Sequence, residues 1–120
     1  MESSAQAMSV ALDRIWAQFL PAIEERVAKL KEAGDALAMR SLPEDLRTEA
    51  HAAAHKLAGV LGTFGLAQGT LLAREGEAIL CGDSQPGPAA VARFNVVVQQ
   101  LRDLVAGRNR RPSSDYTQER

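Results

Sequence analysis

Two histidines stand four residues apart in the stretch "AHAAAHKLAGVLGTFGL", residues 50–66, which otherwise holds mainly alanine, glycine and leucine. A neutral imidazole near pH 7 has a lone pair on one ring nitrogen, and that nitrogen can act as a nucleophile or bind a metal ion. His51 and His55 are therefore the residues of this sequence that point most directly to chemistry.

A zinc site is the first chemistry to weigh, because two histidines at positions i and i+4 of a helix can bind this ion. The metalloprotease pattern needs a glutamate directly after the first histidine, and this chain has Ala52 there. No third ligand stands nearby in the sequence. We therefore expect no metal site and no cofactor in this chain.

The elements that must position the histidines are predicted to be helices. Alanine, leucine, glutamate and arginine dominate and aromatic residues make up only 4% of the chain, so helix is favoured almost everywhere and the predicted fold class is all-α. A short first helix is indicated by apolar residues at helical spacing: Leu12, Ile15, Trp16, Phe19 and Leu20. Pro21 then marks the start of a second helix, with inward residues Ile23, Val27, Leu30 and Leu37.

The third helix carries both histidines. Ser41 and Glu44 have the spacing of a capping box, in which the hydroxyl and the carboxylate satisfy free backbone amides. This pattern predicts a helix that opens near Leu42 or Pro43 and runs to about Leu61.

Two further helices follow. Gly62 and Gly65 interrupt the third helix, and a fourth is predicted over residues 66–81. Gly82 ends it and Pro88 starts a fifth, in which the apolar residues at helical spacing are Phe94, Val97, Leu101 and Leu104.

These elements predict one domain. A chain of 120 residues is the size of a single domain, and helices joined by short connections are typical of an antiparallel four-helix bundle. We therefore expect a four-helix bundle with a short additional N-terminal helix over residues 1–107. Residues 108–120 are polar and contain proline, so they are predicted to be a linker or disordered tail.

Charge and cysteine content exclude several classes of function. The chain has 14 basic and 15 acidic residues and a net charge of -1, with only a short basic run at 108–111, so binding to nucleic acid or to a membrane surface is not expected. Cys81 is the only cysteine and cannot form an internal disulfide. With no long apolar run and no apolar leader, we expect a reduced, monomeric, cytoplasmic protein.

A helical wheel places His55 on the outside of the bundle. At about 100° per residue, the apolar residues of the third helix gather on one face: Leu46, Ala50, Ala53, Leu57 and Leu61. His55 falls about 180° from Leu46 and therefore points toward solvent. The other residues on this outer face are His51, Ala52, Ala58, Gly59 and Gly62.

This outer face is unusual because its residues are small. Exposed helix faces normally carry lysine, glutamate or arginine, and a glycine such as Gly59 costs about 1 kcal/mol of helix stability relative to alanine. Small residues leave the imidazole accessible to another protein at close range. On the fourth helix Leu71 lies away from the small residues that face the core, and it is either an isolated exposed residue or part of the same docking surface.

The segment "AHKLAGVLGTFGL", residues 54–66, resembles the phospho-acceptor segment of histidine-containing phosphotransfer (HPt) domains. In that family a leucine follows the histidine after two residues, and glycines follow it after four and ten. The matching residues are His55, Leu57, Gly59 and Gly65. The flanking stretches "WAQFLPAIEERV" and "LAQGTLLAREGEAIL" are also similar to the family's neighbouring helices, so the likeness covers about residues 10–106.

The resemblance implies a phosphorelay carrier. His55 would accept a phosphoryl group from a receiver-domain aspartate or from a kinase, and would pass it to another receiver aspartate. The implied partners are response-regulator receiver domains and hybrid sensor histidine kinases. The sequence has no Walker loop, kinase glycine loop or acidic magnesium cluster, so Mg²⁺ is expected in the partner receiver and the chain is not expected to be an independent enzyme.

One position departs from the family pattern. Many HPt domains have a lysine three residues after the histidine, where its charge helps to balance the phosphate, and this chain has Ala58 there. Lys56 lies about 100° around the helix from His55, and His51 lies about 40° away, so either side chain is a candidate for that support. His51 is alternatively a solvated surface residue without a role.

A second class of function stays open from the sequence. The same bundle is compatible with an interaction module that binds receiver or kinase domains without carrying phosphate. The presence of His55 together with Gly59 favours the carrier.

Overall fold

The computed structural model describes residues 4–82 and 85–110. They form four α-helices and no strand: α1 (Ser4–Ala38), α2 (Glu44–Thr63), α3 (Ala67–Leu80) and α4 (Pro88–Arg110). The all-α class predicted from the sequence is confirmed.

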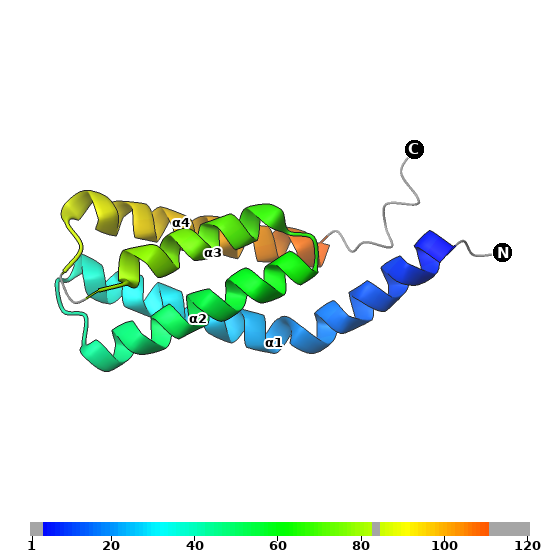
Figure 1. Cartoon of the computed structure of the whole chain (residues 1–120), viewed down its shortest axis with the longest axis horizontal. Helices are drawn as coiled ribbons and strands as arrows, with labels where there is room; N and C mark the ends of the chain where they lie inside the picture. The colour runs from blue at the N-terminus through cyan, green and yellow to red at the C-terminus, as the bar shows by residue number, and fades with distance from the viewer. Residues whose placement is uncertain (1–3, 83–84, 111–120) are drawn as a thin grey trace.

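The helices form an antiparallel bundle in which each one packs against two others (Figure 1). α2 lies between α1 and α3, and α4 closes the ring between α3 and α1. The inward residues predicted for α1 are all buried. The largest fully buried side chains come from all four helices: Ile23, Leu30, Leu57, Leu61, Leu80, Phe94, Val97, Val98 and Leu101. This shared core fixes the helices relative to one another.

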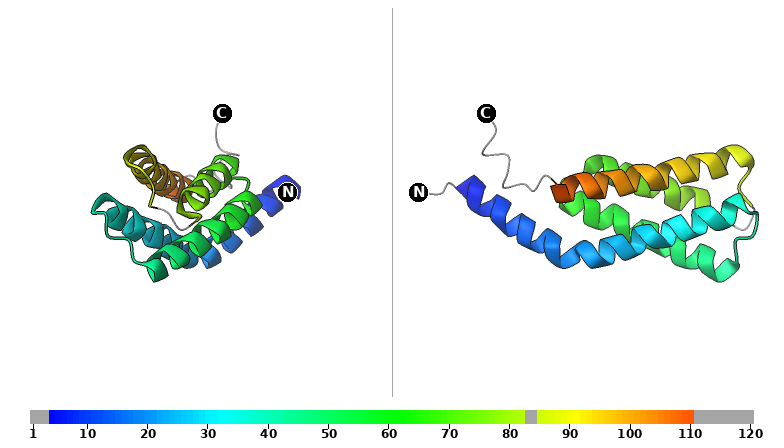
Figure 2. Two further views of the ribbon diagram at one scale, coloured as in Figure 1. Left: turned by 60° about the vertical axis from the view of Figure 1, so that its left-hand side comes forward. Right: turned by 180° about the vertical axis from the view of Figure 1, so that it is seen from behind.

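The predicted short N-terminal helix is not a separate element, because α1 continues through Pro21. A proline inside a helix removes one backbone hydrogen bond and bends the helix without always ending it. Trp16 before the proline and Ile23 after it are both buried, so the bundle holds both halves in one helix. Figure 2 shows that α1 is bent and that its N-terminal part extends beyond the other helices.

The predicted capping box at the start of α2 is wrong. The helix begins at Glu44 after Pro43, and no side chain caps it. Ser41 belongs instead to the end of α1, where its backbone N–H donates to the Ala36 carbonyl over 2.9 Å. Arg40 beside it has a positive φ of 56°, which turns the chain out of α1. The fixed φ of proline then prepares the backbone for α2.

A short turn at Gly65 sets α2 and α3 side by side. Gly65 has a φ of 75°, and Leu66 N–H donates back to the Leu61 carbonyl over 2.9 Å, which closes α2 as a glycine C-cap does. On α3, a Cβ atom added to Gly69 would lie 2.8 Å from Leu61 Cδ1 and 2.7 Å from Leu104 Cδ2. Gly69 therefore allows α3 to approach its neighbours closely.

The end of α4 anchors the first half of α1. α4 continues past Gly107 to Arg110, so residues 108–110 are helical where the sequence predicted a polar tail; residues 111–120 of that tail lie outside the described residues. Trp16 Nε1–H donates to Asn109 Oδ1 over 2.8 Å, and the Arg108 guanidinium lies 5.0 Å from the Trp16 ring centre. Arg108 also pairs with Asp13 over 3.0 Å.

Truncation after Gly107 should therefore loosen the N-terminal half of α1. It removes a hydrogen bond, a cation–π contact and a largely buried ion pair, so we expect a loss of about 1–3 kcal/mol in the free energy of unfolding. Trp16 is the only tryptophan, and its fluorescence emission should shift to longer wavelength. A control truncated after Arg110 should keep both properties of the full chain, and equal behaviour of the two truncated proteins would contradict this account.

Candidate functional site

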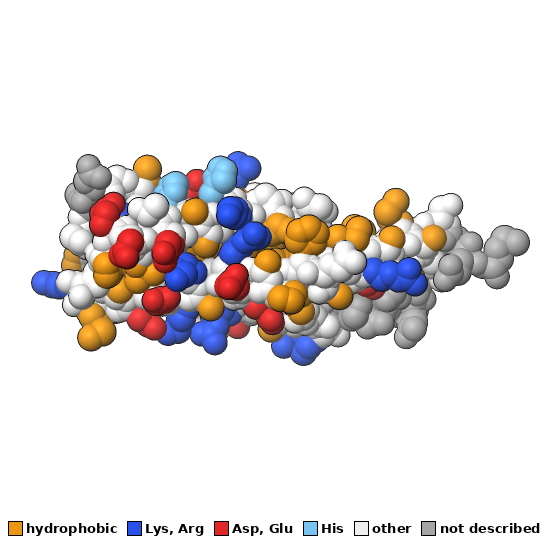
Figure 3. Space-filling view, turned by 90° about the horizontal axis from the view of Figure 1, so that it is seen from below, with side chains coloured by type: hydrophobic (Ala, Val, Ile, Leu, Met, Phe, Trp, Pro, Cys, Tyr) orange, Lys and Arg blue, Asp and Glu red, His pale blue; other side chains and the backbone are white. Residues whose placement is uncertain are grey.

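His55 lies in the middle of α2 with its side chain 75% exposed, as the helical wheel predicted. His51 lies one turn earlier and is half-buried. Both histidine side chains reach the surface on the same side of the molecule (Figure 3). The histidine with the motif spacing is therefore accessible from solvent.

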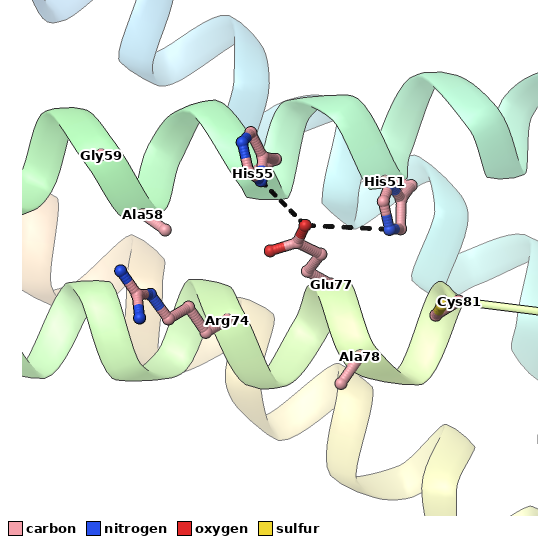
Figure 4. A pocket seen from close by; sticks show the side chains of 8 residues that line it. All are labelled: His51, His55, Ala58, Gly59, Arg74, Glu77, Ala78 and Cys81. Atoms are coloured by element: carbon pink, nitrogen blue, oxygen red, sulfur yellow. Dashed lines mark hydrogen bonds and ion pairs between the residues drawn. The ribbon is translucent and has the colours of Figure 1, made fainter.

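The carboxylate of Glu77 on α3 faces both imidazoles (Figure 4). Its Oε2 atom lies 2.9 Å from Nδ1 of His55 and 3.8 Å from Nε2 of His51. The sequence interpretation missed this residue. The signal was present, because His55 stands ten residues before Gly65 and Glu77 twelve residues after it, and an antiparallel helix pair brings such positions level.

The hydrogen bond to Glu77 favours one of the two neutral tautomers of His55. An ionised carboxylate only accepts hydrogen bonds, so Nδ1 of His55 is the nitrogen that carries the proton. In the neutral ring Nε2 then keeps its lone pair, and this atom lies on the side of the ring away from Glu77 (Figure 4). The arrangement thus leaves an exposed ring nitrogen of His55 without a proton and open to solvent.

A shallow pocket surrounds these groups between α2 and α3. Its volume is about 550 Å³. α2 contributes His51, His55, Ala58 and Gly59, and α3 contributes Arg74, Glu77, Ala78 and Cys81. Cys81 is exposed at the end of α3. The site is thus formed by two helices, whereas the sequence placed all of its candidate residues except Leu71 on one.

Ala58 does not lie on the exposed outer face where the sequence placed it, because it is only 6% exposed. Its carbonyl accepts a hydrogen bond of 2.8 Å from Thr70 Oγ1 of α3. The wheel treated the bundle interior as a single direction, but α2 packs against both α1 and α3 and therefore buries a wider arc. Ala58 forms the floor of the pocket and not part of a flat outer surface.

The remaining predicted site residues divide between the pocket and its surroundings. Gly59 lines the pocket, and an added Cβ atom would meet nothing within 4 Å. Ala52, Gly62, Lys56 and Leu71 are all exposed but do not line it. Leu71 is a large apolar side chain on the surface of α3, which agrees with both of its predicted alternatives.

A second carboxylate on α3 has a different role. Glu75 accepts hydrogen bonds from the guanidinium of Arg93 on α4, with Nη2 at 2.7 Å from Oε1. The Arg93 guanidinium holds the pKa of the Glu75 carboxyl below its usual range. Glu75 thus joins α3 to α4, while Glu77 faces the histidines on α2.

Within residues 4–82 and 85–110, no group of three or more histidine, cysteine, aspartate or glutamate residues is placed to hold a metal ion. None of the helices over these residues is both long enough and apolar enough to span a membrane.

The fold and the site together define a class of protein: a small antiparallel helical bundle that presents one exposed histidine from the middle of a helix. The family model described as "Hpt domain" matches residues 14–107, and the chain belongs to this family. HPt domains are histidine phosphotransfer modules, carriers rather than classical enzymes, and they interact with receiver and kinase domains. Neither the curated proteins nor the solved structures gave a match.

Substitution of Glu77 by glutamine should allow His55 to populate both of its neutral tautomers. The glutamine amide can donate as well as accept a hydrogen bond, so the contact no longer favours the tautomer with its proton on Nδ1. ¹⁵N NMR of the neutral ring should show a clear change in the ratio of the two tautomers. The control is Glu75→Gln on the same helix, which leaves the histidines untouched; an unchanged ratio in Glu77→Gln would contradict the assignment of the proton.

Proposed function

We propose that this chain is a phosphorelay carrier in which Nε2 of His55 accepts a phosphoryl group and passes it on. The observation that carries the proposal is the hydrogen bond between Nδ1 of the exposed His55 and Glu77. It leaves the lone pair of Nε2 open to solvent and to a partner. Membership of the HPt family and the motif around His55 support the same assignment.

The transfer step needs no base in this chain. The Nε2 lone pair attacks the phosphorus of an aspartyl phosphate, the bond between phosphorus and the aspartyl oxygen breaks, and the aspartate leaves as a carboxylate. The ring becomes a phosphorylated imidazolium, with its proton still on Nδ1. Glu77 faces this proton over 2.9 Å, so its negative charge stabilises the positive charge that the ring acquires.

The partner supplies the rest of the chemistry in this proposal. Phosphoryl transfer depends on positioning and on charge stabilisation, for which Mg²⁺ in the receiver domain is the expected source. The donor is a receiver aspartate or a hybrid sensor histidine kinase, and the acceptor is a receiver aspartate. The carrier contributes an oriented nucleophile and a surface on which the partner can dock.

The small residues around His55 support docking at close range. Ala52, Gly59 and Gly62 are exposed on α2, and none of them extends beyond the imidazole. Leu71 adds an exposed apolar side chain from α3. The small size of these α2 residues leaves room for a receiver domain to bring its aspartate to Nε2.

Substitution of His55 by glutamine should abolish labelling by phosphorylated receivers. Glutamine preserves size and hydrogen bonding but has no nucleophilic nitrogen, and the exposed position makes normal folding the expectation. His51→Gln should keep labelling and slow transfer by about tenfold or less, because in this proposal His51 forms no covalent bond to the phosphoryl group. Acid-labile phosphate on the purified proteins is the measurement.

The reverse result would move the acceptor to His51. If neither histidine variant nor the unchanged chain takes label while all bind the receivers, the chain is the interaction module that carries no phosphate.

Substitution of Gly59 by lysine should hinder docking of a partner without destabilising the fold. Lysine is a better helix former than glycine and the position is open, so the free energy of unfolding should rise by up to about 1 kcal/mol. Its long side chain should nevertheless hinder a partner beside His55 and lower the rate of receiver transfer at least tenfold. Gln100→Lys, which adds the same charge on the exposed side of α4, is the control; equal rates in the two variants would show that the small surface is not used.

A further inference from the structure

A phosphoryl group on His55 needs a positive partner that the family pattern does not provide in this chain. The phosphoryl oxygens carry negative charge, and many HPt domains place a lysine three residues after the histidine. Here that position is Ala58, whose side chain is buried against α3. The cation must therefore come from elsewhere in the site.

The two cations suggested by the sequence are poorly placed for this task. Lys56 does not line the pocket. His51 directs its Nε2 toward Glu77, so when it is protonated its charge is already shared with that carboxylate. His51 also lies on the opposite side of His55 from Gly59 (Figure 4).

Arg74 on α3 meets the requirement. It lines the pocket together with His55 and Gly59, and its side chain is exposed. In the part of the chain that the structure describes it makes no hydrogen bond or ion pair. In Figure 4 its guanidinium extends from α3 toward Ala58 and Gly59, on the far side of His55 from His51.

We propose that Arg74 is the residue that binds the phosphoryl oxygens when His55 is phosphorylated, in place of the family's lysine. The inference rests on the proposed function of His55. Arg74 and Glu77 are three residues apart and so project from neighbouring positions on one face of α3. Glu77 holds Nδ1, and Arg74 lines the same pocket on the Gly59 side of His55, where the space beside Gly59 is open.

The chemistry of a guanidinium suits this role. Its planar donors match phosphoryl oxygens in a two-point geometry, and its charge persists at any pH of interest. No proton moves to or from Arg74 in the transfer step. It stabilises the charge on the phosphoryl oxygens while the bond to Nε2 forms, and it keeps those oxygens bound afterwards.

The test uses phosphoramidate, a small donor that needs no partner protein. Nε2 attacks its phosphorus, the phosphorus–nitrogen bond breaks, and the protonated nitrogen leaves as ammonia. Arg74→Gln removes the charge and should slow phosphorylation of His55 about tenfold, the factor expected for one charge-assisted hydrogen bond. Mass spectrometry identifies the modified residue, and the same sample gives the lifetime of the phosphohistidine, which should shorten.

Three further variants test whether the positive charge at position 74 is what determines the rate of phosphorylation. Arg74→Lys should restore most of the rate because it keeps a cation at the same position. Arg102→Gln removes an equal charge from an exposed position on α4 and should leave the rate unchanged. Lys56→Gln tests the competing cation of α2. Thermal unfolding of every variant checks that the fold is intact.

The outcomes distinguish this inference from the function on which it rests. If His55 is phosphorylated at equal rates in the unchanged chain and in Arg74→Gln, or if only Lys56→Gln slows it, Arg74 is not the phosphate-binding residue and the carrier function stands. The proposal is also overturned if Arg74→Gln slows phosphorylation of His55 and Arg74→Lys slows it equally. The positive charge at this position would then not be the cause of the effect. If the unchanged chain accepts no phosphoryl group from phosphoramidate or from receivers, the proposed function itself fails.

Discussion

The close packing of α3 on α2 is the constraint on which the site depends. Gly69 permits it, since even a Cβ atom at this position would lie within 3 Å of Leu61 and of Leu104. Only at this separation does the carboxylate of Glu77 reach Nδ1 of His55. A bundle with the same helices set further apart would still expose His55, but its ring would be free to rotate and to exchange tautomers.

The interactions at the site therefore orient groups more than they stabilise the fold. A hydrogen bond or ion pair between exposed side chains contributes only about 0–1 kcal/mol to the free energy of unfolding. The stability of α2 and α3 comes instead from the buried residues beneath them, among them Leu57, Leu61 and Leu80. Because this apolar core fixes the backbone on both sides, the weak contact between His55 and Glu77 needs only to select a rotamer and a tautomer.

Periodicity in the sequence was enough to predict the all-α class, most of the buried residues and the exposure of His55, because each of these follows from residues on one helix. The errors have other causes. Pro21 is a local signal for a helix boundary, but packing on both sides of it keeps α1 continuous. Ser41 has the spacing of a helix cap, but its backbone bonds to the end of the preceding helix. Glu77 was missed, and Ala58 misplaced, because both depend on a neighbouring helix that a wheel for one helix does not include.

The junction of α1 with the end of α4 and the pocket of His55 are held by different interactions, and this bears on what a partner can change. Where α1 meets the end of α4, Trp16 is held by Arg108 and Asn109 through contacts that are partly buried. The pocket of His55 is instead open, and its charged groups are exposed or half-buried on two rigid helices. A partner that docks there removes water from groups that are already oriented, which strengthens their electrostatic interactions without any rearrangement of the backbone. Such an arrangement suits a carrier, since the same surface can be presented unchanged to a donor and to an acceptor.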